Sequence, residues 1–309
     1  VMTSTERTSF LTQLARDVFG DLGDADALLS ALTPALGLTR EEILRGAQHA
    51  ADPDGALAAI ARIARRDAGA VSDALQRMAP SVWRLLGASS GFADFFLRHP
   101  AELAHLVGPG SPLPTAEELH SELTAAVGAD AEGFAATGDE SAWVALRVRY
   151  RRMLARIAVH DLGADDAVAV LAPVAACLAD AAGAALEASL CVARTRVAGG
   201  APGSGLFPRA QVADTRLAII GMGKTGAREL NYVSDVDVIF VGGGSDELVE
   251  QVGESRVIDI ATRLAVQTMR GISGMEIEPP LWEVDANLRP EGKQGALVRT
   301  LESHLSYYD

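Results

Sequence analysis

Apolar positions in the first 135 residues recur mainly at i, i+3 and i+4. This spacing gathers them on one face of an α-helix. Thr39 and Glu42 have the spacing of a capping box at the start of one such segment, and Pro100 suits the first turn of a helix. The pattern predicts short helices over 3–19, 24–32, 39–50, 55–67, 70–78 and 91–107, the last divided at Pro100. We therefore expect an all-helical subdomain over residues 1–135, with a Pro/Gly-rich linker at 108–115.

Two longer helical patterns follow. The first runs over 139–163, from Asp139 as N-cap to Gly163 as the stop, and the second is alanine-rich and runs over about 165–198, with a kink expected at Pro173. The alanine-rich run approaches membrane-spanning length, but Asp180 lies inside it, so we expect a buried core helix. The first helix carries a run of arginines, which is open to two interpretations, a solvated face or an anion contact near an active site. These arginines are Arg147, Arg149, Arg151, Arg152 and Arg156.

The composition changes after a loop over 198–211. Short runs rich in Val, Ile and Leu predict strands over 215–221, 236–242 and 281–289, and a helical pattern over 254–271 separates the last two. A strand-containing module thus follows a long helical region, which is typical of an α/β or α+β module, and we expect the α+β class. We expect a second domain over 136–309, with long helices over 139–198 and a small mixed sheet from about residue 215.

Charge and composition narrow the class of function. The 309-residue chain carries a net charge of −14, which disfavours a nucleic-acid partner because such partners require a basic face. Cys177 and Cys191 form no C-x-x-C motif, so we expect two buried reduced thiols. The N-terminal residues contain no apolar signal segment, and we expect a cytoplasmic protein with no membrane partner.

The segment over 219–240, "IIGMGKTGARELNYVSDVDVIF", fits three nucleotide-binding patterns. A P-loop would require glycine at position 218, which is Ala218. A dinucleotide-binding fold would require a crossover helix and a second parallel strand with an acidic residue at its far end. The stretch from Lys224 to Ser234 is short for that crossover, and Asp235 and Asp237 precede the apolar run instead of following it.

The third pattern, a metal-dependent nucleotidyltransferase site, uses every part of the segment. Gly221 and Gly223 end a strand and allow the backbone to approach a phosphate at a helix N-terminus. Asp235 and Asp237 alternate with an apolar residue, so both carboxylates point to one face of a strand, with Cα atoms about 7 Å apart. Asp285 alternates in the same way in a later strand and supplies a third oxygen ligand for Mg²⁺.

With these residues identified, the chain resembles the bacterial glutamine synthetase adenylyltransferase/adenylyl-removing enzymes, a branch of the polymerase-β-like nucleotidyltransferases. The resemblance lies in "GMGKTGARELNYVSDVDVIF" and "VDANLRPEGKQGALVRTLESHLSYY", and upstream in "RRMLARIAVHDL" and "LGASSGFADFFLRHPAEL". It implies a polymerase-β-like nucleotidyltransferase fold in which Asp235, Asp237 and Asp285 are the catalytic and metal-binding residues. It also implies phosphate or nucleotide binding at Gly221, Gly223, Lys224, Ser234 and Arg289.

The resemblance implies a bifunctional family. One module attaches AMP from ATP to a tyrosine of glutamine synthetase, and the other removes it by phosphorolysis, which yields ADP. Met2 and the short stretch before the motif favour the N-terminal, removing module, and we expect the helical bundle that follows in the family to be missing here.

The implied cofactor is Mg²⁺ in a two-ion site, with Mn²⁺ as a substitute. The implied partners are glutamine synthetase, inorganic phosphate, ADP or ATP, and a PII signalling protein. ATP-dependent attachment and a catalytically silent docking fragment remain alternatives.

Overall fold

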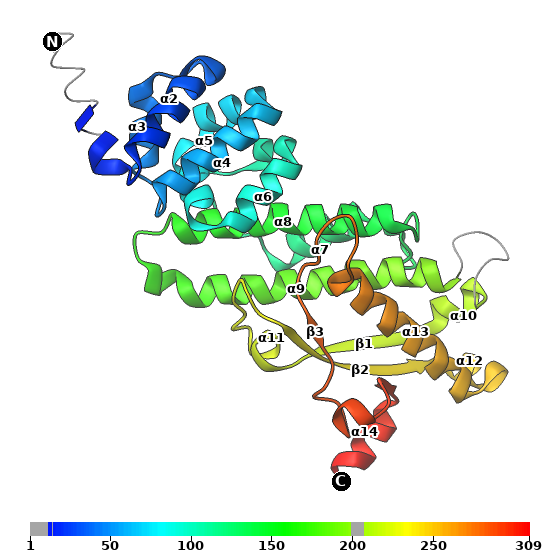
Figure 1. Ribbon diagram of the computed structural model, residues 1–309. Coiled ribbons are helices and arrows are strands. Elements are labelled where there is room, and N and C mark those ends of the chain that lie inside the picture. Colours follow the sequence, from blue (N-terminus) through cyan, green and yellow to red (C-terminus); the bar gives the residue numbers. More distant parts are fainter. Residues whose placement is uncertain (1–11, 14, 199–206) are drawn as a thin grey trace. The chain divides into compact units, whose positions relative to one another are not determined.

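The computed structural model describes residues 12–13, 15–198 and 207–309. The chain divides into two compact units, Val1–Leu113 with Ala155–Val170, and Pro114–Leu154 with Leu171–Asp309. Two long helices, α8 (Glu140–Leu162) and α9 (Ala167–Ala198), each contribute residues to both units (Figure 1). The helix predicted over 3–19 lies mostly outside the described residues, as does much of the loop predicted over 198–211. The domain boundary expected at residue 135 stays a prediction.

The first unit is helical in its described part. Side-chain caps begin several of its helices: Asp52, for example, accepts the Gly55 N–H and precedes Pro53, a residue suited to the first turn. Trp83, Phe95 and Phe96 are fully buried in this unit. Its elements between residues 22 and 105 are α2 (Leu22–Leu36), α3 (Arg40–Ala47), α4 (Pro53–Arg66), α5 (Ala68–Ala88), α6 (Ser90–Arg98) and the 3-10 helix η1 (Pro100–His105).

Three details of this unit test the predicted pattern. The capping box is confirmed, because the Thr39 side chain accepts the Glu42 N–H and the Glu42 carboxylate accepts the Thr39 N–H at 2.7 Å. The helix predicted over 70–78 continues to Ala88 beyond a non-helical residue, Met78, close to Pro80, which lacks an amide donor. The division at Pro100 is confirmed, and the short helix that begins there is a 3-10 helix.

Residues 155–170 belong to the first unit through contacts with the segment before residue 113. The His160 ring nitrogen Nδ1 lies 2.9 Å from the Ser111 carbonyl oxygen. Gly163 lies so close to Pro109 that an added Cβ would come within 2.5 Å of the proline Cβ. The C-terminal part of α8 is therefore packed against the Pro/Gly-rich segment of its own unit.

The second unit combines helices with a small sheet. Its shorter helices are α7 (Ala116–Ala126), α10 (Arg209–Asp214), α11 (Gly223–Ala227), α12 (Asp246–Val252), α13 (Glu254–Ser273), the 3-10 helix η2 (Gly292–Gln294) and α14 (Leu301–Tyr308). Its strands are β1 (Thr215–Gly221), β2 (Val236–Gly244), β3 (Val284–Asp285) and β4 (Val298–Arg299). The helix α7 was not among the predicted helices, although Thr115 and Glu118 form a second capping box at its start.

The sheet is mixed and centred on β2. β1 pairs antiparallel with β2, from Thr215 opposite Gly244 to Gly221 opposite Val238. β3 and β4 pair parallel with β2, at Val236–Asp237 and at Phe240–Val241 respectively. The helix α13 packs against β1 and β2 (Figure 1). This arrangement confirms the expected α+β class with a small mixed sheet.

The core of this unit explains the alternation of residue types in β2. Val236, Val238 and Phe240 are fully buried, whereas Asp237 between them is only half-buried and faces the other way. The apolar face of α13 is buried as well, including Val257, Ile260 and Leu264. Burial of one strand face against a helix thus turns the aspartates toward the opposite side of β2.

The alanine-rich helix α9 is long and apolar enough to cross a membrane by length and composition. Soluble core helices commonly pass the same test, and most residues of α9 from Val174 to Val197 are buried. Cys177 and Cys191 are both buried and free on this helix. Burial raises the pKa of the Cys191 thiol to about 11, so it stays protonated and unreactive at neutral pH.

The arginine run on α8 does not form a single solvated face, which was one of the two interpretations. Arg147 is completely buried. Arg149 pairs with Glu122 of α7, and Arg151 pairs with Glu278, whose side chain is almost fully buried. The spacing of the arginines along α8 could not reveal these partners, because they are backbone carbonyls and acidic residues distant in sequence.

Candidate active site

The candidate site lies where β1 ends and β2 begins. Met222, just after β1, donates its N–H to the Asp237 carbonyl oxygen at 2.9 Å, so the two strands stay paired up to the glycine-rich turn. The short helix α11 and a loop then connect the two strands. Because β1 and β2 are antiparallel, this connection is not the parallel crossover of a dinucleotide-binding fold, in agreement with the sequence argument.

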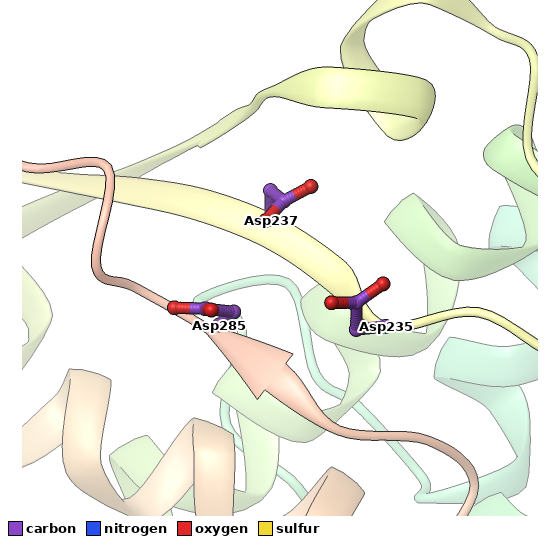
Figure 2. Close-up of side chains that lie close together, drawn as sticks. All are labelled: Asp235, Asp237 and Asp285. Atoms are coloured by element: carbon purple, nitrogen blue, oxygen red, sulfur yellow. The ribbon is translucent and has the colours of Figure 1, made fainter.

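Three aspartates converge here from two neighbouring strands. Asp235 immediately precedes β2, Asp237 is the second residue of β2, and Asp285 ends β3 directly opposite Asp237. One carboxylate oxygen from each residue lies within 4.8 Å of those from the other two (Figure 2). Asp235 is exposed and the other two are half-buried. Residues 50 positions apart are therefore brought together by the parallel pairing of β2 with β3.

The neighbouring carboxylates perturb Asp237. The pKa of Asp237 is raised above its ordinary value, first because partial burial disfavours the charged form, and then because the charges of Asp235 and Asp285 repel it. The ammonium of Lys224 acts in the opposite direction but does not cancel the effect. A cation between the three groups would remove this repulsion.

The geometry and the donor set suit a hard divalent cation. Mg²⁺ binds oxygen ligands at about 2.0–2.1 Å, so two oxygens on one ion are at most about 4 Å apart, and two ions about 3.5–4 Å apart accept a somewhat wider set. The spacing of the three carboxylates is close to these limits. We conclude that Asp235, Asp237 and Asp285 could hold one or two such ions.

Gly223 is constrained by its contact with the acidic cluster. Its backbone has a φ of 51°, in the left-handed region that favours glycine. A Cβ added at this position would lie 2.5 Å from the Oδ2 atom of Asp237. Gly221 ends β1, and a Cβ added there would lie 3.3 Å from the Thr225 side chain, a tight contact. A Cβ on Gly226 would lie 2.4 Å from the Gly221 carbonyl oxygen. The glycines thus allow the turn to fold closely beside the Asp237 carboxylate.

Lys224 and Ser234 lie beside the aspartates. The Lys224 ammonium donates to the Ser234 hydroxyl at 3.0 Å and to the Asn231 side-chain oxygen at 3.4 Å. The Ser234 hydroxyl in turn donates to the Asp235 carboxylate at 3.4 Å. These predicted anion-binding residues are therefore close to the carboxylates, and Asn231 is a further polar member that the sequence argument did not single out.

Arg289 occupies a different setting. Its guanidinium donates to the carbonyl oxygens of Ala286, Lys293 and Gly295, at 2.7, 3.4 and 3.1 Å. These contacts fold the loop between β3 and β4, whereas the contacts of Lys224 lie beside the aspartates. Within the same loop the Asn287 N–H donates to Asp285 Oδ1 at 2.7 Å and orients that carboxylate.

An ion pair with α9 also holds the end of the β1–β2 connection. Arg228, at the C-terminal end of α11, has a φ of 59° and donates through both terminal nitrogens to the Asp180 carboxylate of α9, at 2.6 and 2.8 Å. No local sequence signal marks this pair, because its members are 48 residues apart. The pair fixes the end of the segment that carries Gly223 and Lys224.

Comparison with known proteins identifies the family of this chain. Residues 79–309 match the family described as glutamate-ammonia ligase adenylyltransferase. This match covers the acidic cluster, the glycine turn and all described strands of the second unit.

Curated relatives extend the similarity to nearly the whole chain. A bifunctional glutamine synthetase adenylyltransferase/adenylyl-removing enzyme of Leifsonia xyli is 54% identical over 97% of this chain and 29% of its own length. Proteins with the same name from Streptomyces avermitilis and Mycobacterium avium are 39% and 41% identical, over 98% and 86% of this chain. The chain spans less than a third of the length of these relatives. Taken with the converging aspartates, these matches show that the chain belongs to the glutamate-ammonia ligase adenylyltransferase family.

Proposed function

We propose that this chain removes AMP from an adenylylated tyrosine of glutamine synthetase by Mg²⁺-dependent phosphorolysis. The observation that supports it is the convergence of Asp235, Asp237 and Asp285 beside the glycine turn of the β1–β2 connection. The names of the relatives, which include an adenylyl-removing activity on glutamine synthetase, supply the substrate. The control of nitrogen assimilation, through a PII signalling protein in the cytoplasm, is the setting we propose for it.

Each group at the site has a role in this reaction. Asp235, Asp237 and Asp285 would hold the divalent ions, with Mn²⁺ able to replace Mg²⁺. Such ions neutralise charge on the entering and leaving oxygens of an in-line displacement at phosphorus. The backbone at Gly221 and Gly223 lies against the phosphate groups, and Lys224 with Ser234 donates hydrogen bonds to their oxygens. Arg289 serves the phosphate site if its guanidinium exchanges a loop carbonyl for a phosphate oxygen.

The reaction balances with inorganic phosphate as the only co-reactant. A phosphate oxygen forms a bond to the adenylyl phosphorus while the bond from that phosphorus to the tyrosine oxygen breaks. The phosphate and adenylyl groups leave as ADP, and the phenolate oxygen takes up the proton that phosphate gives up. Divalent ions held by three carboxylates would suit this chemistry, because the negative charge is spread over phosphate oxygens that such ions can neutralise.

The opposite direction is the second candidate. The relatives are named bifunctional, and attachment of AMP from ATP to the same tyrosine would use the same set of carboxylates. A catalytically silent fragment that docks glutamine synthetase is the third. The three candidates share a fold and differ in which substrates the site turns over.

Two assays separate them. The full chain is incubated with AMP-modified glutamine synthetase, ³²P-labelled inorganic phosphate and Mg²⁺, and the product is separated by chromatography. Labelled ADP is expected, and Asp235→Asn should reduce its rate by at least about 100-fold. Asp259→Asn, at an exposed position of α13 paired with Arg263, is the matched control and should retain the rate. Label transfer from ATP to unmodified synthetase would instead support attachment, and inactivity in both assays would support docking.

A further inference from the structure

The connection from α13 to β3 contains no regular secondary structure over residues 274–283, yet it leads directly to Asp285. β3 itself has only two residues, and its register with β2 comprises only Val284 opposite Val236 and Asp285 opposite Asp237. So short a strand contributes few ladder hydrogen bonds with which to fix its position. Other contacts must therefore hold Asp285 beside the other two carboxylates.

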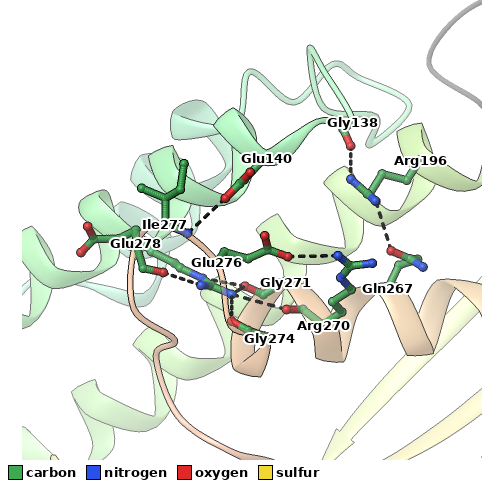
Figure 3. A network of polar contacts seen from close by, with 11 residues as sticks. Gly138, Glu140, Arg196, Gln267, Arg270, Gly271, Gly274, Glu276, Ile277 and Glu278 are labelled. Carbon is green, nitrogen blue, oxygen red and sulfur yellow. Dashed lines mark hydrogen bonds and ion pairs between the residues drawn. The ribbon is translucent and has the colours of Figure 1, made fainter.

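Arg147 of α8 supplies the largest set of such contacts. Its guanidinium donates to the Gly271 carbonyl at 2.9 and 3.0 Å, to the Gly274 carbonyl at 2.8 Å and to the Glu278 carbonyl at 2.6 Å. A longer contact of 3.4 Å reaches the Arg270 carbonyl. Figure 3 shows these carbonyls converging from the end of α13 and from the following connection. One side chain thus gathers the end of the helix and the start of the connection.

Neighbouring residues of α8 continue this contact along the connection. Arg151, one turn further, donates to the carbonyls of Pro279 and Pro280, each at 2.8 Å, and pairs with the Glu278 carboxylate at 3.1 Å. The Tyr150 hydroxyl accepts the indole N–H of Trp282 at 3.2 Å. Residues 147, 150 and 151 lie on one face of the helix, so they contact successive parts of the connection. Only Glu283 separates Trp282 from β3, and Asp285 lies three positions after Trp282.

The chemistry of arginine explains why this residue stands here. Arg147 is completely buried, and the hydrogen bonds described above all go to backbone carbonyl oxygens. Burial lowers the pKa of Arg147, and the charges of Glu276, Glu278 and Glu140 oppose this effect. A guanidinium has five N–H donors in a fixed plane, whereas a lysine ammonium is a compact point charge with three. Lysine at this position could not reach four separate carbonyls.

We propose that Arg147 is a positioning residue, which holds the α13–β3 connection so that the Asp285 carboxylate lies within ligand distance of Asp235 and Asp237. The inference rests on the proposed metal-dependent function, because it concerns the third carboxylate of that site. It assigns a role at this site to Arg147, which is far in sequence from the segment over 219–240 and lies on a helix that contributes none of the three aspartates. A role in general stability alone would not distinguish Asp285 from the other two aspartates.

The first test measures Mn²⁺ affinity by electron paramagnetic resonance on the full chain. Arg147→Lys is expected to weaken Mn²⁺ binding about tenfold, as changes in residues that support metal ligands commonly do. In an Asp285→Asn background the same substitution should produce no further weakening, because the ligand through which it acts is already lost. Arg149→Lys is the matched control on the same helix, since Arg149 pairs with Glu122 of α7 and should leave the affinity unchanged. Equal weakening in both backgrounds would overturn the proposal.

The second test does not depend on the metal. Hydrogen–deuterium exchange of the metal-free chain should become roughly tenfold faster in Arg147→Lys for amides of residues 281–287, with β1 and the central part of β2 unchanged. Unchanged exchange over 281–287 would overturn the proposal. If the wild-type chain binds no Mn²⁺, the proposed function fails, and hydrogen–deuterium exchange alone tests whether Arg147 positions the connection. If Arg147→Lys does not fold, Arg151→Lys replaces it in both tests, with the same expected pattern and a smaller change.

Discussion

Asp237 is half-buried at the second position of β2, with two further carboxylates beside it. Its pKa is raised in the metal-free protein by burial and by the charges of Asp235 and Asp285. A carboxyl with a folded-state pKa above its unfolded value destabilises the folded state when it ionises. The penalty is absent below the unfolded pKa of about 3.9, grows between the unfolded and the folded-state pKa, and is complete above the folded-state pKa.

Asp237→Asn is therefore expected to stabilise the metal-free chain at pH 7 while it weakens metal binding. A melting-temperature increase of roughly 1–3 °C in EDTA is expected, because like charges at a partly exposed site contribute about 1 kcal/mol or less. The measurement is thermal unfolding of both proteins at pH 4 and pH 7, and the difference between them should shrink toward pH 4. A variant less stable than wild type at pH 7 would contradict this account of the cluster.

Gly223 occupies a position in the turn that requires glycine. Its left-handed backbone and its contact with the Asp237 carboxylate both oppose any side chain. Gly223→Ala is expected to cost about 1–2 kcal/mol in free energy of unfolding and to weaken Mn²⁺ binding by displacing Asp237. Urea denaturation and Mn²⁺ titration measure the two effects. Gly243→Ala is the control, because an added Cβ there meets no atom within 4 Å, and comparable losses in both variants would refute the argument.

At the scale of elements, α11 is a short helix held at its end by the bidentate pair of Arg228 with Asp180. Arg228 has a left-handed backbone, which costs free energy in a residue other than glycine. Its ion pair compensates for that cost only in part, because the arginine side chain is 57% exposed. The end of this helix therefore combines backbone strain with a long-range contact.

Arg228→Ala and Arg228→Gly are expected to differ for this reason. Alanine loses the ion pair and keeps the strained backbone, so it should destabilise the chain by about 1 kcal/mol. Glycine loses the same pair but relieves the strain, so it should be nearly neutral in stability. Urea denaturation of the two variants and wild type provides the measurement. Equal stability of the alanine and glycine variants would show that the left-handed backbone at this position carries no cost.

The elements also show where local sequence signals suffice. The capping box at Thr39 follows from a few neighbouring residues, and the sequence argument placed it. The next helix was expected to begin at Gly55, whereas α4 begins at Pro53, directly after its cap Asp52. The helix α7 begins with the same kind of box at Thr115 but was not predicted, although its signal was present. β4 was missed because two residues paired with a distant strand carry no recognisable periodicity.

At the scale of the whole molecule, the division of the chain does not follow sequence order. Residues 155–170 cluster with the first unit, and residues 114–135 cluster with the second. In the second unit the Thr195 hydroxyl donates to the Ala135 carbonyl at 2.9 Å, and the Ala135 N–H donates to the Cys191 carbonyl at 3.1 Å. The segment before residue 135 is thus bound to α9.

A fragment of residues 1–135 is accordingly expected to be poorly folded. It would lack the end of α8 that contacts Ser111 and Pro109, and its residues after 114 would lose their partners on α9. We expect binding of the dye ANS and a broad urea transition for the fragment, in contrast to the full chain. A sharp cooperative transition in the isolated fragment would instead support the boundary expected from the sequence at residue 135.

The sequence alone determined most of the helix pattern, the α+β class and the candidate aspartates, and its motifs indicated the family by resemblance. It could do so because caps, periodicity and the D-x-D alternation are properties of neighbouring residues. Only the tertiary structure decided that Asp285 faces Asp237 across a two-residue strand pair, that Arg147 is buried among carbonyls, and that Arg228 binds Asp180. These contacts join residues about 50 to 130 positions apart. Their formation depends on how whole elements pack together, which no local pattern encodes.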